Sequence, residues 1–144
     1  ILNEFDLNSK VISYLRKYYT DILFNASLGE NQDTDQKRLN SWKLGYTSGF
    51  PDMVIFEHNQ SYNGLSIEFK SPNGKGVISE KQKEINEKMA DRGFKTLISN
   101  DYDDIIKEIN HYLSKRRFKC NRCRLKFHTT TTLKTHLEII HRIK

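Results

Sequence analysis

The hydrophobic pattern of the chain begins with a helix. Residues 4–19 contain neither glycine nor proline, and apolar side chains recur there at spacings that fit one helical face: Phe5, Ile12, Leu15 and Tyr19. Residues 21–27 are short, apolar and compatible with a strand. The polar stretch at 28–40 predicts a loop that enters a short helix before Gly45.

A hairpin follows in the middle of the chain. Residues 53–56 form an uninterrupted apolar run, which predicts a strand buried on both faces. The sequence HNQSYNG predicts a turn, and residues 65–70 predict a second strand that returns beside the first. Alternation along this second strand puts Ser66, Glu68 and Lys70 on one face. The hairpin therefore combines a buried apolar strand with a row of polar side chains.

Two helices and one strand complete this part of the chain. Ser79 and Gln82 have the form of a capping box for a helix over residues 80–92. Residues 94–99 predict a strand, and Asp101 predicts the cap of a last helix with an apolar stripe made of Tyr102, Ile105, Ile106, Ile109 and Leu113. The order α, β, β-hairpin, α, β, α predicts an α/β fold with a mixed sheet flanked by helices.

Charge divides the chain into a body and a tail. Residues 114–144 hold ten Lys and Arg against one acid, whereas residues 1–113 hold 14 bases and 17 acids. The net charge of +9 on the tail predicts a polyanion such as nucleic acid as its partner. The body has a net charge of −3, so it requires metal ions or another source of positive charge to bind the same polyanion. We expect a main domain at 1–113, a basic linker at 114–117 and a small domain at 118–144.

Hydropathy restricts the class of protein further. No apolar run approaches the roughly 18 residues that span a bilayer, and the chain starts without a basic and apolar secretory leader. The two cysteines do not suggest a disulfide framework. These features predict an intracellular protein, located in the cytoplasm or nucleus of a host if its source is viral.

The tail carries a spacing typical of metal ligands. The pattern C-x2-C-x12-H-x4-H is formed by Cys120, Cys123, His136 and His141. Two thiolates on a tight turn and two imidazoles one helical turn apart can close a tetrahedron around Zn²⁺. The pattern resembles the two-Cys, two-His zinc finger and predicts a small ββα unit. Because four protein ligands fill the zinc, the metal is expected to be structural. A chance meeting of two cysteines and two surface histidines is the alternative.

The finger is expected to bind DNA with little sequence readout. In the zinc-finger family the base-reading positions precede the first histidine, and here they fall on Thr129, Thr132 and Thr135. Threonine lacks the paired donors and acceptors that distinguish bases, so we expect contacts to phosphates and to DNA shape. The cations expected to make them are Arg116, Arg117, Arg122, Arg124, Lys126 and Lys134. A finger that docks on protein is the alternative.

Three polar residues of the hairpin suggest a second metal site. Closing the turn places Asp52 roughly opposite Phe69 and within reach of Glu68 and Lys70. Converging carboxylates repel each other unless a cation lies between them, and oxygen ligands suit Mg²⁺ or Mn²⁺. Such a metal beside Lys70, which could orient a water, suggests phosphodiester hydrolysis. A surface ion pair between Glu68 and Lys70 is the alternative.

The residues around the hairpin resemble a nuclease family. PD at 51–52 and EFK at 68–70 resemble the PD-(D/E)xK nuclease signature. The segments GFPDMVIF, IEFKSPNGKG and SEKQKEINEKMADRGF, in this order, resemble the VRR-NUC branch of that superfamily, and the resemblance covers about residues 4–113. It implies a restriction-endonuclease-like fold and a Mg²⁺- or Mn²⁺-dependent deoxyribonuclease.

The resemblance also implies roles for single residues. The metal ligands it implies are Asp52, Glu68 and the backbone carbonyl of Phe69. It makes Lys70 the catalytic lysine, Gln82 the family's helix glutamine and Glu4 its first-helix glutamate. The residues alone leave Gln82 open as a capping-box glutamine and Glu4 as a partner of the helix dipole. Phosphates of the cut strand are expected to contact Lys75 and Lys81, although solvated lysines are the alternative.

Small viral and phage members of the family imply a substrate class. By resemblance to them we expect branched or structured DNA, such as a Holliday junction or a flap, and a possible homodimer. Two other interpretations stay open: a catalytically inactive DNA-binding module on a nuclease fold, and a sequence-specific restriction endonuclease. The set of Asp52, Glu68 and Lys70 argues against the first, and the threonines of the finger helix argue against the second.

Overall fold

The computed structural model of the protein describes residues 3–27, 34–71, 77–116, 118–119, 126–127 and 130–142. The elements of the main domain, in chain order, are α1 (Glu4–Tyr18), β1 (Phe24–Ala26), α2 (Asp35–Lys43), β2 (Met53–Ile55), β3 (Gly64–Phe69), α3 (Glu80–Asp91), β4 (Phe94–Ser99) and α4 (Tyr102–Ser114). The tail adds β5 (Phe118–Lys119), β6 (Lys126–Phe127) and α5 (Thr130–Ile140). This order confirms the predicted α/β fold of the main domain.

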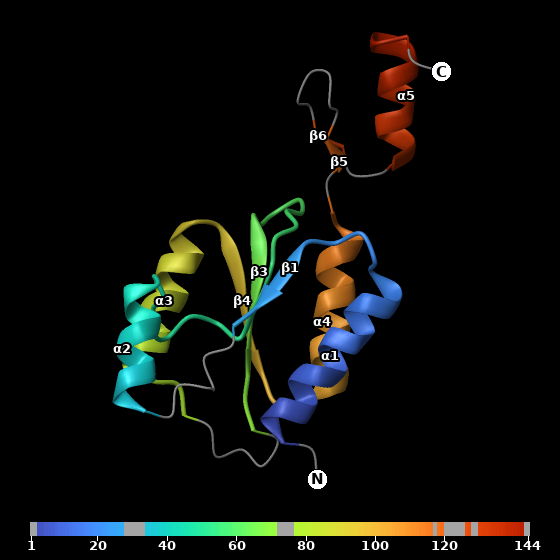
Figure 1. The fold of residues 1–144 in the computed structure, drawn as a ribbon. Helices are drawn as coiled ribbons and strands as arrows, with labels where there is room; N and C mark the ends of the chain where they lie inside the picture. The colour runs from blue at the N-terminus through green and yellow to red at the C-terminus, as the bar shows by residue number, and fades with distance from the viewer. Residues whose placement is uncertain are drawn as a thin grey trace.

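The main domain is built on a mixed sheet with the strand order β1-β2-β3-β4. β1, β2 and β3 pair antiparallel, and β4 runs parallel to β3 because α3 carries the chain back across the sheet. Helices α1 and α4 lie on one side of the sheet, and α2 and α3 lie on the other (Figure 1). The predicted mixed sheet flanked by helices is therefore confirmed.

The register of the hairpin differs by one residue from the expected register. Met53 pairs with Ile67, so Asp52 comes opposite Glu68 where we expected Phe69. The turn between the strands does not determine the register alone, because residues 56–63 are not paired as a simple two-residue hairpin. Since side chains alternate along a strand, this register lets Asp52 approach Glu68 directly.

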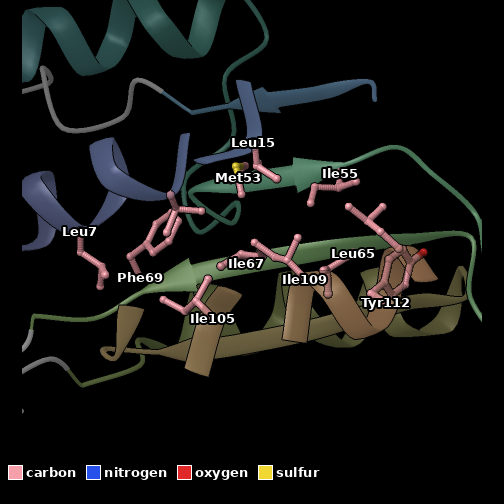
Figure 2. Close-up of a cluster of buried hydrophobic side chains, with 12 residues drawn as sticks. Leu7, Leu15, Met53, Ile55, Leu65, Ile67, Phe69, Ile105, Ile109 and Tyr112 are labelled. Carbon is pink, nitrogen blue, oxygen red and sulfur yellow. The ribbon is translucent and has the colours of Figure 1, made fainter. Parts of the chain in front are cut away.

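The core lies between the sheet and the helices α1 and α4. Leu65, Ile67 and Phe69 of β3 point into it and meet side chains of both helices (Figure 2). Ser66 and Glu68, which alternate with them, are also buried, because β3 is an inner strand covered on both faces. The same alternation that fills the core thus sends Glu68 to the opposite face of the sheet.

The buried face of α1 differs from the predicted face. The fully buried side chains of this helix are Leu7, Val11 and Leu15, whereas Phe5 is 68 % exposed. Leu15 belongs to both stripes, but Phe5 lies two residues away from Leu7, about 200° around the helix. The expected position of Phe5 in the core was wrong because docking against α4 favours the Leu7 stripe.

The N-caps of α3 and α4 are the residues that the sequence predicted. Ser79 and Gln82 form the predicted capping box at the start of α3, and Asp101 caps α4. The short helix expected before Gly45 is α2, which begins after the cap Thr34 and buries none of its residues. Phe56, expected in the strand, lies beyond β2 and is 48 % exposed.

The tail forms a small separate unit. β5 and β6 pair antiparallel and α5 follows them, which is the order expected for a ββα unit. We call β5, β6 and α5 the finger unit; it lies beyond the end of α4 (Figure 1). Among the described helices, none has both the length and the apolar character needed to cross a membrane.

Candidate active site

Asp52 is fixed at the end of the sheet. It directly precedes β2, its carboxylate Oδ2 accepts a hydrogen bond from the backbone N–H of Phe69 at 2.8 Å, and its carbonyl accepts one from Ser27 at 2.8 Å. The N–H and C=O groups of one residue point to the same side of an extended strand. The carbonyl of Phe69 therefore lies on the side of β3 that faces Asp52.

Glu68 is a buried carboxylate beside a second one. Only 6 % of the residue is exposed. Burial and the nearby charge of Asp52 raise the pKa of Glu68 to about 7, and the ammonium of Lys70 opposes this shift. The Lys70 Nζ lies 3.5 Å from the Glu68 Oε1. The end of β3 thus holds more negative charge than one lysine neutralises, which favours a cation there.

Gln82 connects α3 to this carboxylate. Its Oε1 accepts a hydrogen bond from the backbone N–H of Ser79 at 2.9 Å, and its Nε2 donates to Oε1 of Glu68. The Lys70 Nζ lies 3.5 Å from the same Gln82 Oε1. The capping box fixes the amide, so that its donor side faces Glu68. The two interpretations of Gln82, helix cap and site residue, are therefore compatible in one side chain.

These side chains line a pocket of about 400 Å³. Glu4 lines it from the start of α1, where its charge also raises the pKa of Glu68. Lys81 lines it from α3 and donates a hydrogen bond to Ser48 Oγ at 3.1 Å. The structure brings together the predicted residues of the main domain that it describes, namely Glu4, Asp52, Glu68, Lys81 and Gln82 in the pocket wall and Lys70 beside it.

One part of the pocket wall was not predicted from the sequence. The loop at 45–50 contributes Tyr46, Ser48 and Phe50. Gly49 lets this loop approach α3, since its φ is +88° and a Cβ there would lie 2.7 Å from the backbone carbonyl carbon of Lys81. Two glycines four residues apart were the available signal for a tight loop, but their spacing did not say what the loop covers.

The oxygen atoms at this end of the sheet fit a hard divalent cation. Asp52, Glu68 and the carbonyl of Phe69 are oxygen donors, as Mg²⁺ and Mn²⁺ prefer. In the part of the chain that the structure describes, no cluster of three or more His, Cys, Asp or Glu side chains is placed to hold a metal. Binding at this site would therefore use the two carboxylates with the backbone carbonyl.

The cations expected to contact DNA occupy several places. Lys134 is exposed on α5. Arg116 instead turns toward the body, with its Nη1 3.3 Å from Asp21 Oδ2 and its guanidinium 6.0 Å from the ring centroid of Tyr19. Lys126 belongs to β6. The remaining expected contacts lie outside the described residues, namely Lys75, Arg117, Arg122 and Arg124.

Two of the expected zinc ligands lie together on the finger unit. The ring centroids of His136 and His141 are 4.9 Å apart, and Nε2 of His141 is buried without a hydrogen-bond partner in the described part of the chain. A buried imidazole nitrogen of this kind fits a metal ligand. Cys120 and Cys123 lie outside the described residues.

Fold and site together define a nuclease-type α/β domain, in which paired carboxylates and a lysine meet at one end of a mixed sheet. The profile of the VRR-NUC domain family matches residues 24–100, more than half of the 144, and the chain belongs to this family. A solved structure described as "VRR_NUC domain protein" shares the fold, with a TM-score of 0.66 and 22 % identity, over 80 % of this chain and 91 % of that one. No curated protein matches the sequence. Membership of the family implies a nuclease-type function.

Proposed function

We propose that the protein is a Mg²⁺- or Mn²⁺-dependent deoxyribonuclease. The observation that carries the proposal is that Asp52 and Glu68 share one pocket and that Lys70 contacts Glu68 beside it. A surface ion pair, the alternative for the hairpin, does not account for a glutamate that is only 6 % exposed and next to a second carboxylate. Buried charges are costly unless they are paired or bind a metal, so their presence in a pocket favours a functional site.

The residues at the pocket have different roles in the proposed phosphodiester hydrolysis. A divalent ion held by Asp52, Glu68 and the Phe69 carbonyl would polarise a phosphate oxygen and lower the pKa of a bound water. Lys70 places its ammonium beside these carboxylates, where it orients the attacking water and stabilises the negative charge that develops on the phosphate. Gln82 holds Glu68 and Lys70 in place through its amide. Glu4 completes the acidic wall.

The finger unit supplies a second binding surface in this proposal. Zn²⁺ held by Cys120, Cys123, His136 and His141 would stabilise it, since a unit of this size has too little core to fold alone. Its charge supports contact with phosphates without sequence readout. The substrate in this proposal is branched or structured DNA, cut by a homodimer, and a viral source and an intracellular location are parts of the same proposal.

The test is a cleavage assay on junction, flap and duplex DNA with Mg²⁺, Mn²⁺ or EDTA. Lys70→Ala and Asp52→Asn should each lower the cleavage rate at least about a hundredfold, the loss typical when one group that stabilises transition-state charge is removed. Lys88→Ala serves as the control, because Lys88 lies on the exposed part of α3 in an ion pair with Glu84. Cleavage that needs no metal, or full activity in both variants, would contradict the proposal.

A further inference from the structure

A second pocket of about 500 Å³ lies along α1, outside the candidate active site. Its charged and aromatic lining residues form what we call the tyrosine–lysine patch, and they are Lys10, Tyr14, Lys17, Tyr18 and Tyr102. Serine hydroxyls complete the lining. None of these side chains belongs to the pocket that contains Asp52 and Glu68. The patch therefore needs an explanation of its own.

The aromatic rings of the patch are held in place by contacts beneath them. The ring centroids of Tyr14 and Tyr18 are 4.7 Å apart, as expected for residues one helical turn apart. The hydroxyl of Tyr14 donates a hydrogen bond to Asn110 Oδ1 of α4 at 3.1 Å, which anchors this ring. Tyr18 packs against the anchored ring at an interplanar angle of 45° and is itself 60 % exposed. The patch is thus a preorganised aromatic surface.

Two lysines lie beside these rings. The Lys10 Nζ is 4.4 Å from the ring centroid of Tyr102, and the Lys17 Nζ is 5.2 Å from that of Tyr18. Both lysines are exposed and two helical turns apart, about 10 Å along the axis. Residues 7–20 contain three bases and no acid, although the main domain as a whole has more acids than bases. The acids next to the patch in the chain lie around Tyr102, which Asp101 precedes and Asp103 and Asp104 follow.

The patch and the candidate active site lie at the same end of the sheet. Lys70 donates its backbone N–H to the carbonyl of Ser99 at 2.9 Å, which joins the ends of β3 and β4, and Tyr102 follows Ser99 by three residues. Glu4, in the wall of the catalytic pocket, precedes Lys10 on the same helix by six residues, about 9 Å. A strand that leaves the catalytic pocket along α1 would pass over the patch.

We propose that the tyrosine–lysine patch binds a single-stranded arm of the nucleic acid substrate next to the cleavage site. Unpaired bases stack on the exposed face of Tyr18 and on the rings beside it, and Lys10 and Lys17 bind the phosphates between those bases. Aromatic rings alternating with cations are the usual means of holding single strands, because every base has a face that can stack. A paired duplex keeps its bases inside and cannot use the rings.

This inference rests on the proposed nuclease function and makes its substrate more specific. The patch accounts for a preference for DNA that carries a flap or another unpaired arm, because only such DNA can reach the catalytic pocket and the rings together. The finger unit contacts phosphates in any DNA, so it does not create this preference. Removing the patch should therefore change the choice of substrate and leave the chemistry intact.

The test measures binding of the full chain to two labelled DNAs, a blunt duplex and the same duplex with a single-stranded arm, in buffer without added Mg²⁺ or Mn²⁺. Tyr18→Ala should weaken binding of the arm-bearing DNA at least about fivefold, the lower end of what one stacked base contributes. Lys17→Ala should weaken the same binding because it removes a contact to a phosphate of the arm. Binding of the blunt duplex should stay the same. Tyr18→Phe should bind like the wild type, because it keeps the ring.

Matched controls exclude a general effect of losing an exposed side chain. Trp42→Ala removes a ring that is 69 % exposed on α2, and Lys88→Ala removes an exposed helical lysine; neither should alter binding of either DNA. The proposal is overturned if Tyr18→Ala behaves like Trp42→Ala, or if both DNAs lose affinity equally. Because binding is measured without cleavage, an inactive wild type with intact arm selectivity would reject the nuclease function and keep the patch.

Discussion

In the proposed function, Glu68 is a residue that serves the reaction at the expense of stability. The carboxylate is buried on the face of β3 opposite the core, and burial together with Asp52 raises its pKa from the ordinary value of 4.5 to about 7. Between these two pH values the folded protein binds a proton that the unfolded chain does not bind. The free energy of unfolding therefore falls as pH rises through this window, and the deficit persists above it.

Glu68→Gln should consequently make the protein more stable at pH 8 in buffer without added divalent ions. The gain is at most about 3 kcal/mol, since each pKa unit corresponds to about 1.4 kcal/mol, and it should vanish near pH 4.5. Thermal or urea unfolding at the two pH values measures it. The control is Glu84→Gln, because Lys88 lowers the pKa of Glu84, so this variant should gain nothing. A Glu68→Gln protein no more stable than the wild type at pH 8 would contradict this account.

The residues of the candidate active site differ in how well they can be predicted from the sequence. Asp52, Glu68 and Lys70 could be found because strand alternation and a turn bring them to one end of a hairpin. The loop residues Tyr46 and Phe50 could not, because they lie in a stretch with no hydrophobic period and reach the pocket only through the backbone of Gly49. Sequence patterns predict which residues of one helix or strand share a face. Which loop residues line the pocket depends on how the elements pack, and no local pattern shows this.

At the scale of elements, the start of α3 combines a structural role with a role in the proposed active site. The hydroxyl of Ser79 accepts a hydrogen bond from the N–H of Gln82 at 3.2 Å, while the Gln82 side chain returns to the N–H of Ser79 and reaches Glu68. The cap therefore positions the glutamine amide as well as starting the helix. The cap of α2, Thr34, starts its helix without contacting the candidate active site.

Ser79→Ala and Thr34→Ala provide a matched comparison of these two roles. Each removes the side chain that caps a helix, α3 or α2, and each should cost about 1 kcal/mol of stability. Only Ser79→Ala should also slow cleavage, by about tenfold, because Gln82 loses part of its support. Unfolding and cleavage measurements on both variants test this. Equal cleavage rates in the two variants would show that the cap does not support the site.

The same scale shows where sequence patterns mislead. Capping residues act within one turn, so Ser79 and Asp101 marked their helices correctly. The buried face of a helix is decided by its neighbour, and the pattern of α1 allowed a stripe with Phe5 that packing against α4 does not use. The parallel pairing of β3 with β4 is also distant in sequence. The order of elements predicted a mixed sheet, but it did not predict which strands are neighbours.

At the scale of the whole molecule, charge is segregated between an acidic main domain and a basic tail. In the proposed function the main domain cuts and the finger unit contributes much of the affinity. Arg116, at the junction, binds Asp21 of the main domain, so the basic segment is anchored to the body at its start.

His141→Ala tests this division of roles. Loss of a zinc ligand should unfold the finger unit, lower bound zinc from one ion per chain to none, and weaken binding to a blunt duplex. The dependence of affinity on salt should become shallower, by about 0.9 in the logarithmic slope for each phosphate that the variant no longer binds. His111→Ala, on an exposed position of α4, is the control. Metal analysis and DNA titrations at several salt concentrations measure both effects. Unchanged affinity at moderate salt would show that the finger unit does not supply it.

The placement of the site residues along the chain has a consequence for how the protein is made. Glu4, Asp52, Glu68 and Gln82 come from α1, the start of β2, β3 and α3, so long loops must close before the four side chains meet. Pairing of distant segments is slow, because the entropy of loop closure is lost before the contacts stabilise the chain. A chain that is still being synthesised, or that is half folded, therefore holds no complete site. The nuclease-type activity that the family implies should then be absent until the whole domain has formed.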